Sequence, residues 1–416
     1  MKNPKDISIE DYTYNLPEER IAQFPVAQRD QSKLLVAENG VLKQDRFRNI
    51  VQYLPSDSLI IFNDTKVIRA RLRFRKATGA QIEIFILEPV LPTAEVQNAF
   101  QVQGQATWKC FVGNAKKWKQ DNLILDFEFA GKQIQLTASK GEALGNAYLI
   151  HFSWTPSDLM FSDILMGSGS IPLPPYMHRE TKPEDIERYQ TIYAKHQGSV
   201  AAPTAGLHFT DAVMQSLDKN NIQTDYVSLH VGAGTFKPVN ADSMGEHEMH
   251  SEQVLISKET IIRLIEKKYK SLIVVGTTST RTLESLYWYG VQLLENPTAV
   301  FKINQWEPYA SDKHLGISAQ QALTAVLDYM NRNSLDILQG ETQIIIAPSY
   351  QFKLVDVLIT NFHQPKSTLL LLVAAFYGEQ WREAYDYALA QDFRFLSYGD
   401  SCVFYRSPSP SPSVQF

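Results

Sequence analysis

Cysteine is scarce in this chain. Only two are present among 416 residues, Cys110 and Cys402, and neither has a second cysteine near it in the sequence. Disulfide frameworks and cysteine-based zinc sites need several closely spaced cysteines, so the pattern argues against both. It is typical of a reducing compartment, and we expect a cytoplasmic protein that holds no metal.

Long apolar runs and a strong charge of either sign are missing too. The longest apolar run, Leu369–Phe376, is too short to cross a bilayer, and the polar start MKNPKDISIEDYTYNL is unlike a secretion signal. The net charge is only −5, so any polyanionic partner must be bound by a local basic patch. We expect no membrane association.

The pattern of the chain changes twice along its length. From Lys66 to Phe152, short alternating segments separated by Gly- and Asn-containing turns predict an antiparallel sheet or small barrel. Residues 1–65 and 153–405 predict strands alternating with helices. The predicted fold class is therefore mixed α/β: a discontinuous α/β domain with a small antiparallel β-barrel domain inserted at 66–152.

Local signals place several helix starts. Ser157-Asp158 precedes LMFSDILMG as an N-cap pair, and Ser257 precedes ETIIRLIEKKYK. Residues 290–340 contain one amphipathic pattern, ISAQQALTAVLDYMNRN, between loop-like flanks, and we expect an insertion there. The SPSPSPS sequence in the tail, 406–416, predicts disorder.

One histidine stands among small and apolar residues. Ser199–Thr210 reads SVAAPTAGLHFT and contains no acid, lysine or arginine, yet it includes His208. The ring is either a hydrogen-bonded core histidine or part of a pocket wall whose small residues let a ligand approach the backbone. Taken alone, the segment favours the core.

Two further segments carry polar side chains that suit a site. Glu246–Glu252 reads EHEMHSE; it is not an HExxH motif, and a surface loop explains it as well as a site does, with a metal the least favoured interpretation. Val275–Arg281 reads VGTTSTR and joins a predicted strand to a predicted helix. Free N–H groups at such a start favour an anion, and Arg281 opposes the helix dipole unless it binds one. Ordinary Ser/Thr capping fits this segment equally well.

Residues 66–76, KVIRARLRFRK, contain six basic side chains and no acid. On a strand, the four arginines at alternate positions project from one face. They are Arg69, Arg71, Arg73 and Arg75. Lys117, in KKWK, adds charge. A solvated strand face is the alternative, but arginine suits phosphate recognition, so we predict a nucleic-acid contact.

Together these segments resemble the S-adenosylmethionine:tRNA ribosyltransferase-isomerase family of the queuosine pathway. The matching segments span nearly the whole chain in order. They are DYTYNLPEERIAQFP (11–25), FNDTKVI (62–68), IPLPPYM (171–177), ERYQTIYAKHQGSVAAPTAGLHFT (187–210), LHVGAGTFKPV (229–239), EHEMHSE (246–252), GTTSTRTLES (276–285), TNFHQPKSTLLLLVAAF (360–376) and RFLSYGD (394–400). Three features depart from the family: Arg69 replaces a proline, Pro348-Ser349-Tyr350 replaces Pro-Gly-Tyr, and the 290–340 segment is longer.

The resemblance implies an activity and its substrates. Members transfer the ribosyl group of S-adenosylmethionine to 7-aminomethyl-7-deazaguanine in a tRNA anticodon and isomerise it, forming epoxyqueuosine and releasing adenine and methionine. The implied partners of the catalytic α/β domain are tRNA and S-adenosylmethionine, the latter as ribosyl donor. We expect that no metal is bound and that the chain is monomeric. The alternative is an S-adenosylmethionine-dependent RNA methyltransferase, whose early Gly-rich loop is not evident here.

The resemblance also implies residue roles. The sulfonium makes the ribose 5′ protons acidic, so a base is required, and adenine departure calls for an acid. The expected catalytic residues are His208, His230, Glu246, His250 and His363. The expected substrate-binding residues are Thr204, Gly206, Gly232, Gly234, Thr235, Thr277, Thr278, Arg281, Asn361 and Lys366. The expected tRNA-binding residues are Arg69, Arg71, Arg73, Arg75 and Lys117. The resemblance moves His208 from the core to the site.

Overall fold

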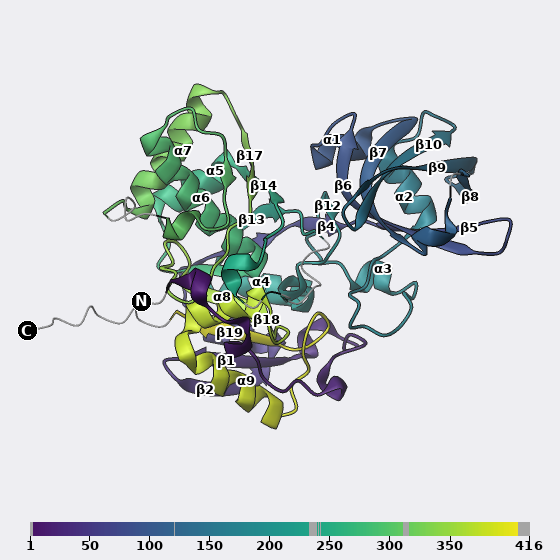
Figure 1. The fold of residues 1–416 in the computed structure, drawn as a ribbon. Helices are drawn as coiled ribbons and strands as arrows, with labels where there is room; N and C mark the ends of the chain where they lie inside the picture. Colours follow the sequence, from purple (N-terminus) through teal and green to yellow (C-terminus); the bar gives the residue numbers. More distant parts are fainter. Residues whose placement is uncertain are drawn as a thin grey trace, which may run out of the picture.

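A computed structural model describes residues 3–119, 121–232, 239, 241, 243–310 and 316–406. The described chain forms a larger part around a mixed sheet and a smaller part around an antiparallel sheet (Figure 1). Among these residues, no helix is both long enough and apolar enough to span a bilayer.

The larger part is built on a ten-stranded sheet of order β16-β17-β14-β13-β3-β15-β18-β19-β1-β2. Its strands are β1 (Lys33–Glu38), β2 (Val41–Arg46), β3 (Leu59–Asn63), β13 (Gln223–Leu229), β14 (Glu252–Ser257), β15 (Leu272–Val275), β16 (Lys302–Ile303), β17 (Ile337–Thr342), β18 (Val357–Asn361) and β19 (Ser401–Tyr405). The four central strands β13, β3, β15 and β18 run parallel. Their carboxyl ends therefore meet at one edge of the sheet, where α/β proteins bind ligands.

Helices cover both faces of this sheet. Alternate residues of β3 pack into two different cores: Leu59 and Ile61 face the helices α6 and α8, whereas Ile60 and Phe62 face α4. The helices are α4 (Asp211–Lys219), α5 (Lys258–Glu266), α6 (Thr277–Glu295), α7 (Ala319–Arg332), α8 (Thr368–Tyr377) and α9 (Trp381–Ala390). This two-sided burial explains the continuous apolar runs of β3, β15 and β18.

Serine side chains begin three of these helices, as the sequence predicts for Ser257. Ser257 Oγ accepts from the Thr260 N–H, and Ser367 Oγ accepts from the Leu370 N–H. Ser318 forms a capping box with Gln321 at the start of α7. The helix expected after Ser157-Asp158 instead begins at Phe161, where the Met160 N–H donates to the carboxylate of Asp163.

The smaller part is a seven-stranded antiparallel sheet of order β11-β5-β6-β7-β10-β9-β8. Its elements are β5 (Arg71–Arg75), β6 (Gln81–Leu91), α1 (Val96–Gln101), β7 (Gln105–Gly113), β8 (Leu123–Phe129), β9 (Lys132–Leu144), β10 (Ala147–Thr155), α2 (Phe161–Ser168) and β11 (Gly169–Ser170). The mixed α/β class with an inserted antiparallel sheet is confirmed. Strands β11 and β8 are the two edges of this sheet and do not pair with each other within the described residues, so the curled sheet is a half-barrel rather than a closed barrel. The smaller part also continues beyond Phe152 through α2 and β11.

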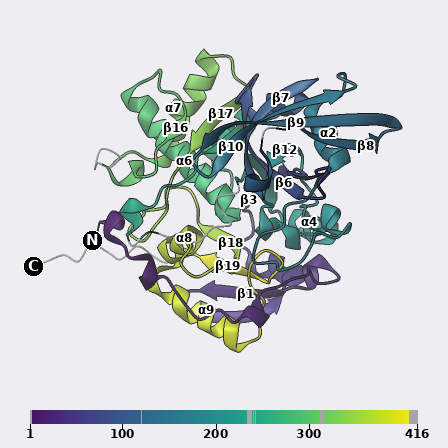
Figure 2. The ribbon, with the colours of Figure 1, turned by 45° about the vertical axis from the view of Figure 1, so that its right-hand side comes forward.

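A two-stranded ribbon joins the two parts. It pairs β4 (Thr65–Val67) with β12 (His196–Ser199) in parallel, and the short helix α3 (Asp185–Arg188) precedes it. The half-barrel also lies beside the β14–β17 end of the main sheet (Figure 2). There Gln339 donates to the Glu95 carboxylate, and the Val96 N–H donates to Gln253 Oε1.

The 290–340 segment is part of the main fold. Helix α6 runs through Gly290 to Glu295, and β16 and β17 extend the sheet. A Cβ on Gly290 would lie 2.2 Å from the Ala322 carbonyl oxygen, so this glycine permits α6 and α7 to cross closely. The sequence pattern predicted loop-like flanks because a glycine inside a helix and two short edge strands leave little periodic signal.

Candidate active site

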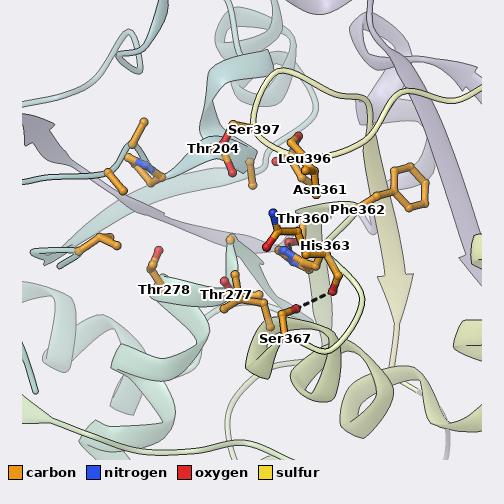
Figure 3. A pocket seen from close by; sticks show the side chains of 18 of the residues that line it. Thr204, Thr277, Thr278, Thr360, Asn361, Phe362, His363, Ser367, Leu396 and Ser397 are labelled. Atoms are coloured by element: carbon orange, nitrogen blue, oxygen red, sulfur yellow. Dashed lines mark hydrogen bonds between the residues drawn. The ribbon is translucent and has the colours of Figure 1, made fainter. Parts of the chain in front are cut away.

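A cavity of about 80 Å³ lies where β15 and β18 end (Figure 3). We call it the strand-end cavity. It is lined by Tyr176, Tyr189, Ala201, Ala202, Pro203, Thr204, Ala205, Val231, Gly276, Thr277, Thr278, Thr360, Asn361, Phe362, His363, Gln364, Ser367, Leu369, Leu396 and Ser397. Residues from several separate parts of the chain thus converge here, among them the SVAAPTAG segment. On the side of the cavity opposite Thr204, Ser367 Oγ donates to the Gln364 carbonyl oxygen at 2.8 Å and so holds that wall in place.

The first turn of α6 forms one wall of this cavity. Ser279 and Thr280 donate their hydroxyls back to the Val275 and Gly276 carbonyls, and no side chain caps the helix. Thr277 and Thr278 line the cavity at this uncapped start. The Asn63 amide donates to Thr278 Oγ1 at 3.3 Å and so holds that hydroxyl. Ser/Thr capping therefore does not explain this segment, and the helix start presents a positive dipole end to a ligand.

Arg281 lies in the same turn but outside the cavity lining. Its guanidinium forms a buried ion pair with Glu252 of β14, and its Nε donates to the Ile344 carbonyl oxygen at 3.1 Å. These partners tie α6 to the neighbouring part of the sheet. The expected role of Arg281 as a ligand for a substrate carboxylate stays a prediction, and it would require the guanidinium to share its charge with Glu252.

His363 lies on the cavity wall directly after β18. Its Nε2 is 3.0 Å from Thr360 Oγ1, and its backbone N–H donates to Tyr385. Burial lowers the pKa of this histidine to about 3. The ring is therefore neutral at physiological pH, and its Nδ1 has no hydrogen-bond partner among the described residues.

His208 lies behind the wall and does not line the cavity. Its Nδ1 is 2.7 Å from Ser32 Oγ, its Nε2 is 3.2 Å from Asn361 Nδ2, and its ring packs against Phe47. Burial, with smaller contributions from Arg394 and Arg29, lowers its pKa to about 3. Asn361, which does line the cavity, separates this ring from any ligand there.

A second cavity, of about 350 Å³, lies between the half-barrel and the main sheet, and we call it the interdomain cavity. The half-barrel side contributes Leu87, Glu88, Pro89, Ala94, Val96, Lys109, Phe111 and Asn146. The main part contributes Gly198, Val200, His230, Val231, Gly232, His250, Ser251, Glu252, Gln253 and Glu341. Val231 lines both cavities, so the two lie on either side of one residue.

His230 is held by both parts of the molecule. Its Nδ1 is 2.9 Å from Thr65 Oγ1, and its Nε2 is 3.0 Å from the amide nitrogen of Gln97 on α1. Gln97 also donates to the Gln197 carbonyl oxygen. Burial, with a smaller effect of His196, lowers the pKa of His230 to about 4. The position of the His230 ring therefore depends on how the half-barrel packs against the main part.

Sequence reasoning missed the groups around His230. His196 Nε2 lies 3.7 Å from the Asp64 carboxylate, whose pKa burial raises and whose other oxygen accepts from Ser228. Asp64 and His196 stand in matched segments, FNDTKVI and the segment at 187–210, so the motifs offered a signal for both. Gln97 lies in a stretch without any motif, and only the fold brings it to the site.

The remaining predicted residues spread over several places. His250 is exposed and lines the interdomain cavity with Gly232, whereas Glu246 is exposed and lines neither cavity. Lys366 forms an ion pair with Glu10 at 2.7 Å outside both. Thr204 lines the strand-end cavity, and Gly206 packs beneath it, where a Cβ would meet Tyr193.

Gly234 and Thr235 lie outside the described residues. Within the described ranges, no three His, Cys, Asp or Glu side chains are grouped so that they could hold a metal ion.

The strand face predicted to carry Arg69, Arg71, Arg73 and Arg75, which we call the basic stripe, is less uniform than the sequence suggests. A break between β4 and β5 turns Arg69 toward the Met166 carbonyl oxygen. Arg71 and Arg73 share the Glu83 carboxylate at 3.1 and 3.4 Å. Arg75 is exposed at the end of β5, and Lys117 is exposed on the same half-barrel. Charge available to a polyanion is therefore concentrated on Arg75 and the lysines.

Comparison with known proteins identifies the family. The model of the queuosine biosynthesis protein family matches residues 9–404. The S-adenosylmethionine:tRNA ribosyltransferase-isomerase of Trichlorobacter lovleyi is 37% identical over 401 residues, covering 95% of this chain and 99% of the relative. Its namesake from Thermosipho melanesiensis is 36% identical over 404 residues, covering 96% and 100%. This chain belongs to the queuosine biosynthesis protein family.

A solved structure is also similar. The crystal structure of S-adenosylmethionine tRNA ribosyltransferase from Thermotoga maritima is 28% identical, covers 94% of this chain and 99% of its own, and superposes with a TM-score of 0.45.

Proposed function

We propose that this chain is an S-adenosylmethionine:tRNA ribosyltransferase-isomerase. It transfers the ribosyl group of S-adenosylmethionine to 7-aminomethyl-7-deazaguanine in a tRNA anticodon, isomerises it to the epoxyqueuosine product and releases adenine and methionine. The observation that carries this proposal is the match to relatives of that name over 95% or more of the chain. We expect a monomeric cytoplasmic enzyme that uses no metal.

The two cavities suit the two substrates. The strand-end cavity offers the uncapped start of α6 to a negatively charged group, and the donor carries one in its methionine carboxylate. The interdomain cavity is wider and lies beside the half-barrel, which suits a base extruded from a tRNA loop. Because Val231 lines both, the ribosyl group of a donor in the first can meet an amine in the second.

The catalytic histidines fit this arrangement unequally. His250 and His230 line the interdomain cavity, and His363 lines the strand-end cavity with a free nitrogen. We assign proton transfer to His250, and we assign the buried, neutral rings of His230 and His363 to positioning the substrates. Glu246 lines neither cavity, and its catalytic role stays a prediction.

The half-barrel carries the proposed tRNA contacts. Arg75 and Lys117 offer exposed charge, while Arg71 and Arg73 already neutralise Glu83. Binding to phosphates through these side chains would be salt-dependent and insensitive to sequence.

One incubation tests the function. The protein is mixed with S-adenosylmethionine and a tRNA carrying 7-aminomethyl-7-deazaguanine, and both small molecules and nucleosides are analysed by mass spectrometry. We expect epoxyqueuosine with free adenine and methionine in equal amounts. S-adenosylhomocysteine and a methylated nucleoside would instead identify an RNA methyltransferase, and an unchanged tRNA would overturn the proposal.

A further inference from the structure

We infer that His208 is a positioning residue. It fixes the amide of Asn361 so that Asn361 Oδ1 accepts a hydrogen bond from an N–H group of the ligand in the strand-end cavity. This inference rests on the proposed function, in which that ligand is S-adenosylmethionine. It gives His208 a different role from the proton transfer that the sequence suggests.

The orientation of the Asn361 amide follows from its neighbours. Its Nδ2 lies 3.3 Å from the Leu396 carbonyl oxygen and 3.4 Å from the Asp400 carbonyl oxygen. Carbonyl oxygens only accept hydrogen bonds, and only the NH₂ end of an amide donates. The opposite orientation would set Oδ1 against two carbonyl oxygens, so Nδ2 must face them.

The same geometry fixes the tautomer of His208. Since Asn361 Nδ2 donates, His208 Nε2 at 3.2 Å must accept, and the ring proton lies on Nδ1. That proton points at Ser32 Oγ, 2.7 Å away. Both ring nitrogens are thus engaged inside the protein, and the ring is 5% exposed. No nitrogen of His208 is available to a substrate proton.

What this pair leaves free is Asn361 Oδ1. Asn361 lines the strand-end cavity and is 2% exposed, and its Oδ1 is buried with no partner among the described residues. A buried acceptor without a donor is costly, so a ligand N–H would be favoured at this atom. S-adenosylmethionine has two groups that supply one, its methionine ammonium and the 6-amino group of its adenine.

Two substitutions at one position separate positioning from proton transfer. In His208→Gln, the side-chain oxygen can take the place of Nε2 and accept from Asn361, but nothing titrates. His208→Leu fills a similar volume and can neither accept nor donate. We expect His208→Leu to weaken S-adenosylmethionine binding by about tenfold, as for one lost hydrogen bond to a ligand, and His208→Gln to recover most of that loss. Isothermal titration calorimetry measures both, at a temperature where thermal unfolding shows each variant folded.

Turnover and a double-mutant cycle complete the test. Single-turnover adenine release from saturated His208→Gln should stay within a few-fold of wild type, whereas a lost general acid or base would lower it by about 10²–10⁴-fold. If His208 acts through Asn361, adding His208→Leu to Asn361→Ala should cause no further loss of donor affinity. Equal affinity of all variants, additive losses, or a His208→Gln enzyme that binds donor but does not turn over would each overturn the inference.

Two analogues identify the N–H group. One replaces the adenine 6-amino group by a carbonyl oxygen, and the other lacks the methionine amino group. The analogue without the recognised group should lose about tenfold in affinity for wild type and nothing further for Asn361→Ala. If neither analogue shows this coupling, Asn361 does not recognise an N–H. A wild type that binds the donor but releases no adenine from it with tRNA would remove the proposed function while leaving these binding tests intact.

Discussion

The two cavities differ in what builds them. The strand-end cavity belongs to the main part alone. Its wall histidine, His363, contacts Thr360, and His208 behind the wall contacts Asn361; both rings are buried and neutral. The interdomain cavity is shared with the half-barrel, and it combines an anchored ring, His230, with an exposed one, His250.

This difference separates recognition from chemistry. Buried rings with a strongly lowered pKa, such as His208 and His363, stay neutral near neutral pH and act by fixing hydrogen-bond geometry. An exposed ring in a cavity shared by two domains can exchange protons with solvent and with a substrate. We therefore expect substitutions around the strand-end cavity to change donor affinity, and those around the interdomain cavity to change turnover.

The largest effect is expected at His250. His250→Asn removes the exposed imidazole from the interdomain cavity, so kcat should fall by about 10²–10⁴-fold while S-adenosylmethionine binding stays near wild type. His363→Asn should act more on donor affinity. Adenine release measured at saturating donor and calorimetric binding give the two quantities. The reverse pattern, with His250→Asn affecting only affinity, would break the division between the cavities.

A smaller loss of turnover is expected for Gly198→Ala. A Cβ at this position would lie 2.6 Å from His230 Nδ1 and 2.8 Å from its Cγ, so the ring must leave Thr65 and Gln97. We expect turnover to fall by about tenfold, within the range for a displaced positioning group, with little change in donor affinity.

Gly290→Ala is the matched control for that variant. Its Cβ would clash with the Ala322 backbone at 2.2 Å, and neither Gly290 nor Ala322 lines either cavity. It should lower the melting temperature, as overpacking of about 1–3 kcal/mol does, and leave turnover per folded molecule unchanged. Equal effects of the two glycine variants on turnover would show that His230 has no special role.

The sequence predicts these two cavities to different extents. The parallel strands β15 and β18 contain continuous apolar runs, and Thr277, Asn361 and His363 stand at or just beyond their carboxyl ends, so the strand-end cavity follows from local pattern. The interdomain cavity depends on how the half-barrel docks, and Gln97 reaches His230 across 133 positions of sequence. Local periodicity contains no information on such a contact. Local periodicity also could not show that Glu252 forms an ion pair with Arg281, because the two residues belong to separate motifs.

The buried histidines also predict a pH dependence of stability. The pKa values of His208 and His363 are about 3 in the folded protein, against about 6.5 when unfolded. Between these values the unfolded chain binds protons that the folded protein does not, so stability falls as pH decreases from 6.5 toward 3. Each ring contributes a slope of at most about 1.4 kcal/mol per pH unit.

Urea unfolding of His208→Gln and His363→Gln between pH 4.5 and pH 8 tests this dependence. Each variant should show a shallower fall than wild type below pH 6.5, and the double variant shallower still. Slopes equal to that of wild type would mean that these rings take up protons in the folded state, and the distinction between fixed and exchanging histidines would fail.

The smallest effect concerns salt and compares the two substrates. The strand-end cavity is buried, so donor binding should change little with salt, whereas tRNA binding should fall linearly on a log–log plot. Arg75→Gln should reduce that slope by about 0.9, equivalent to about a threefold change in affinity between 50 and 200 mM salt. Arg71→Gln is the matched control on the same strand, and its effect should be smaller because Arg71 already pairs with Glu83 at 3.1 Å. Filter binding of tRNA over a salt series measures both slopes. Identical slopes for Arg75→Gln and wild type would assign the stripe to a solvated strand face and place the tRNA on another surface beside the interdomain cavity.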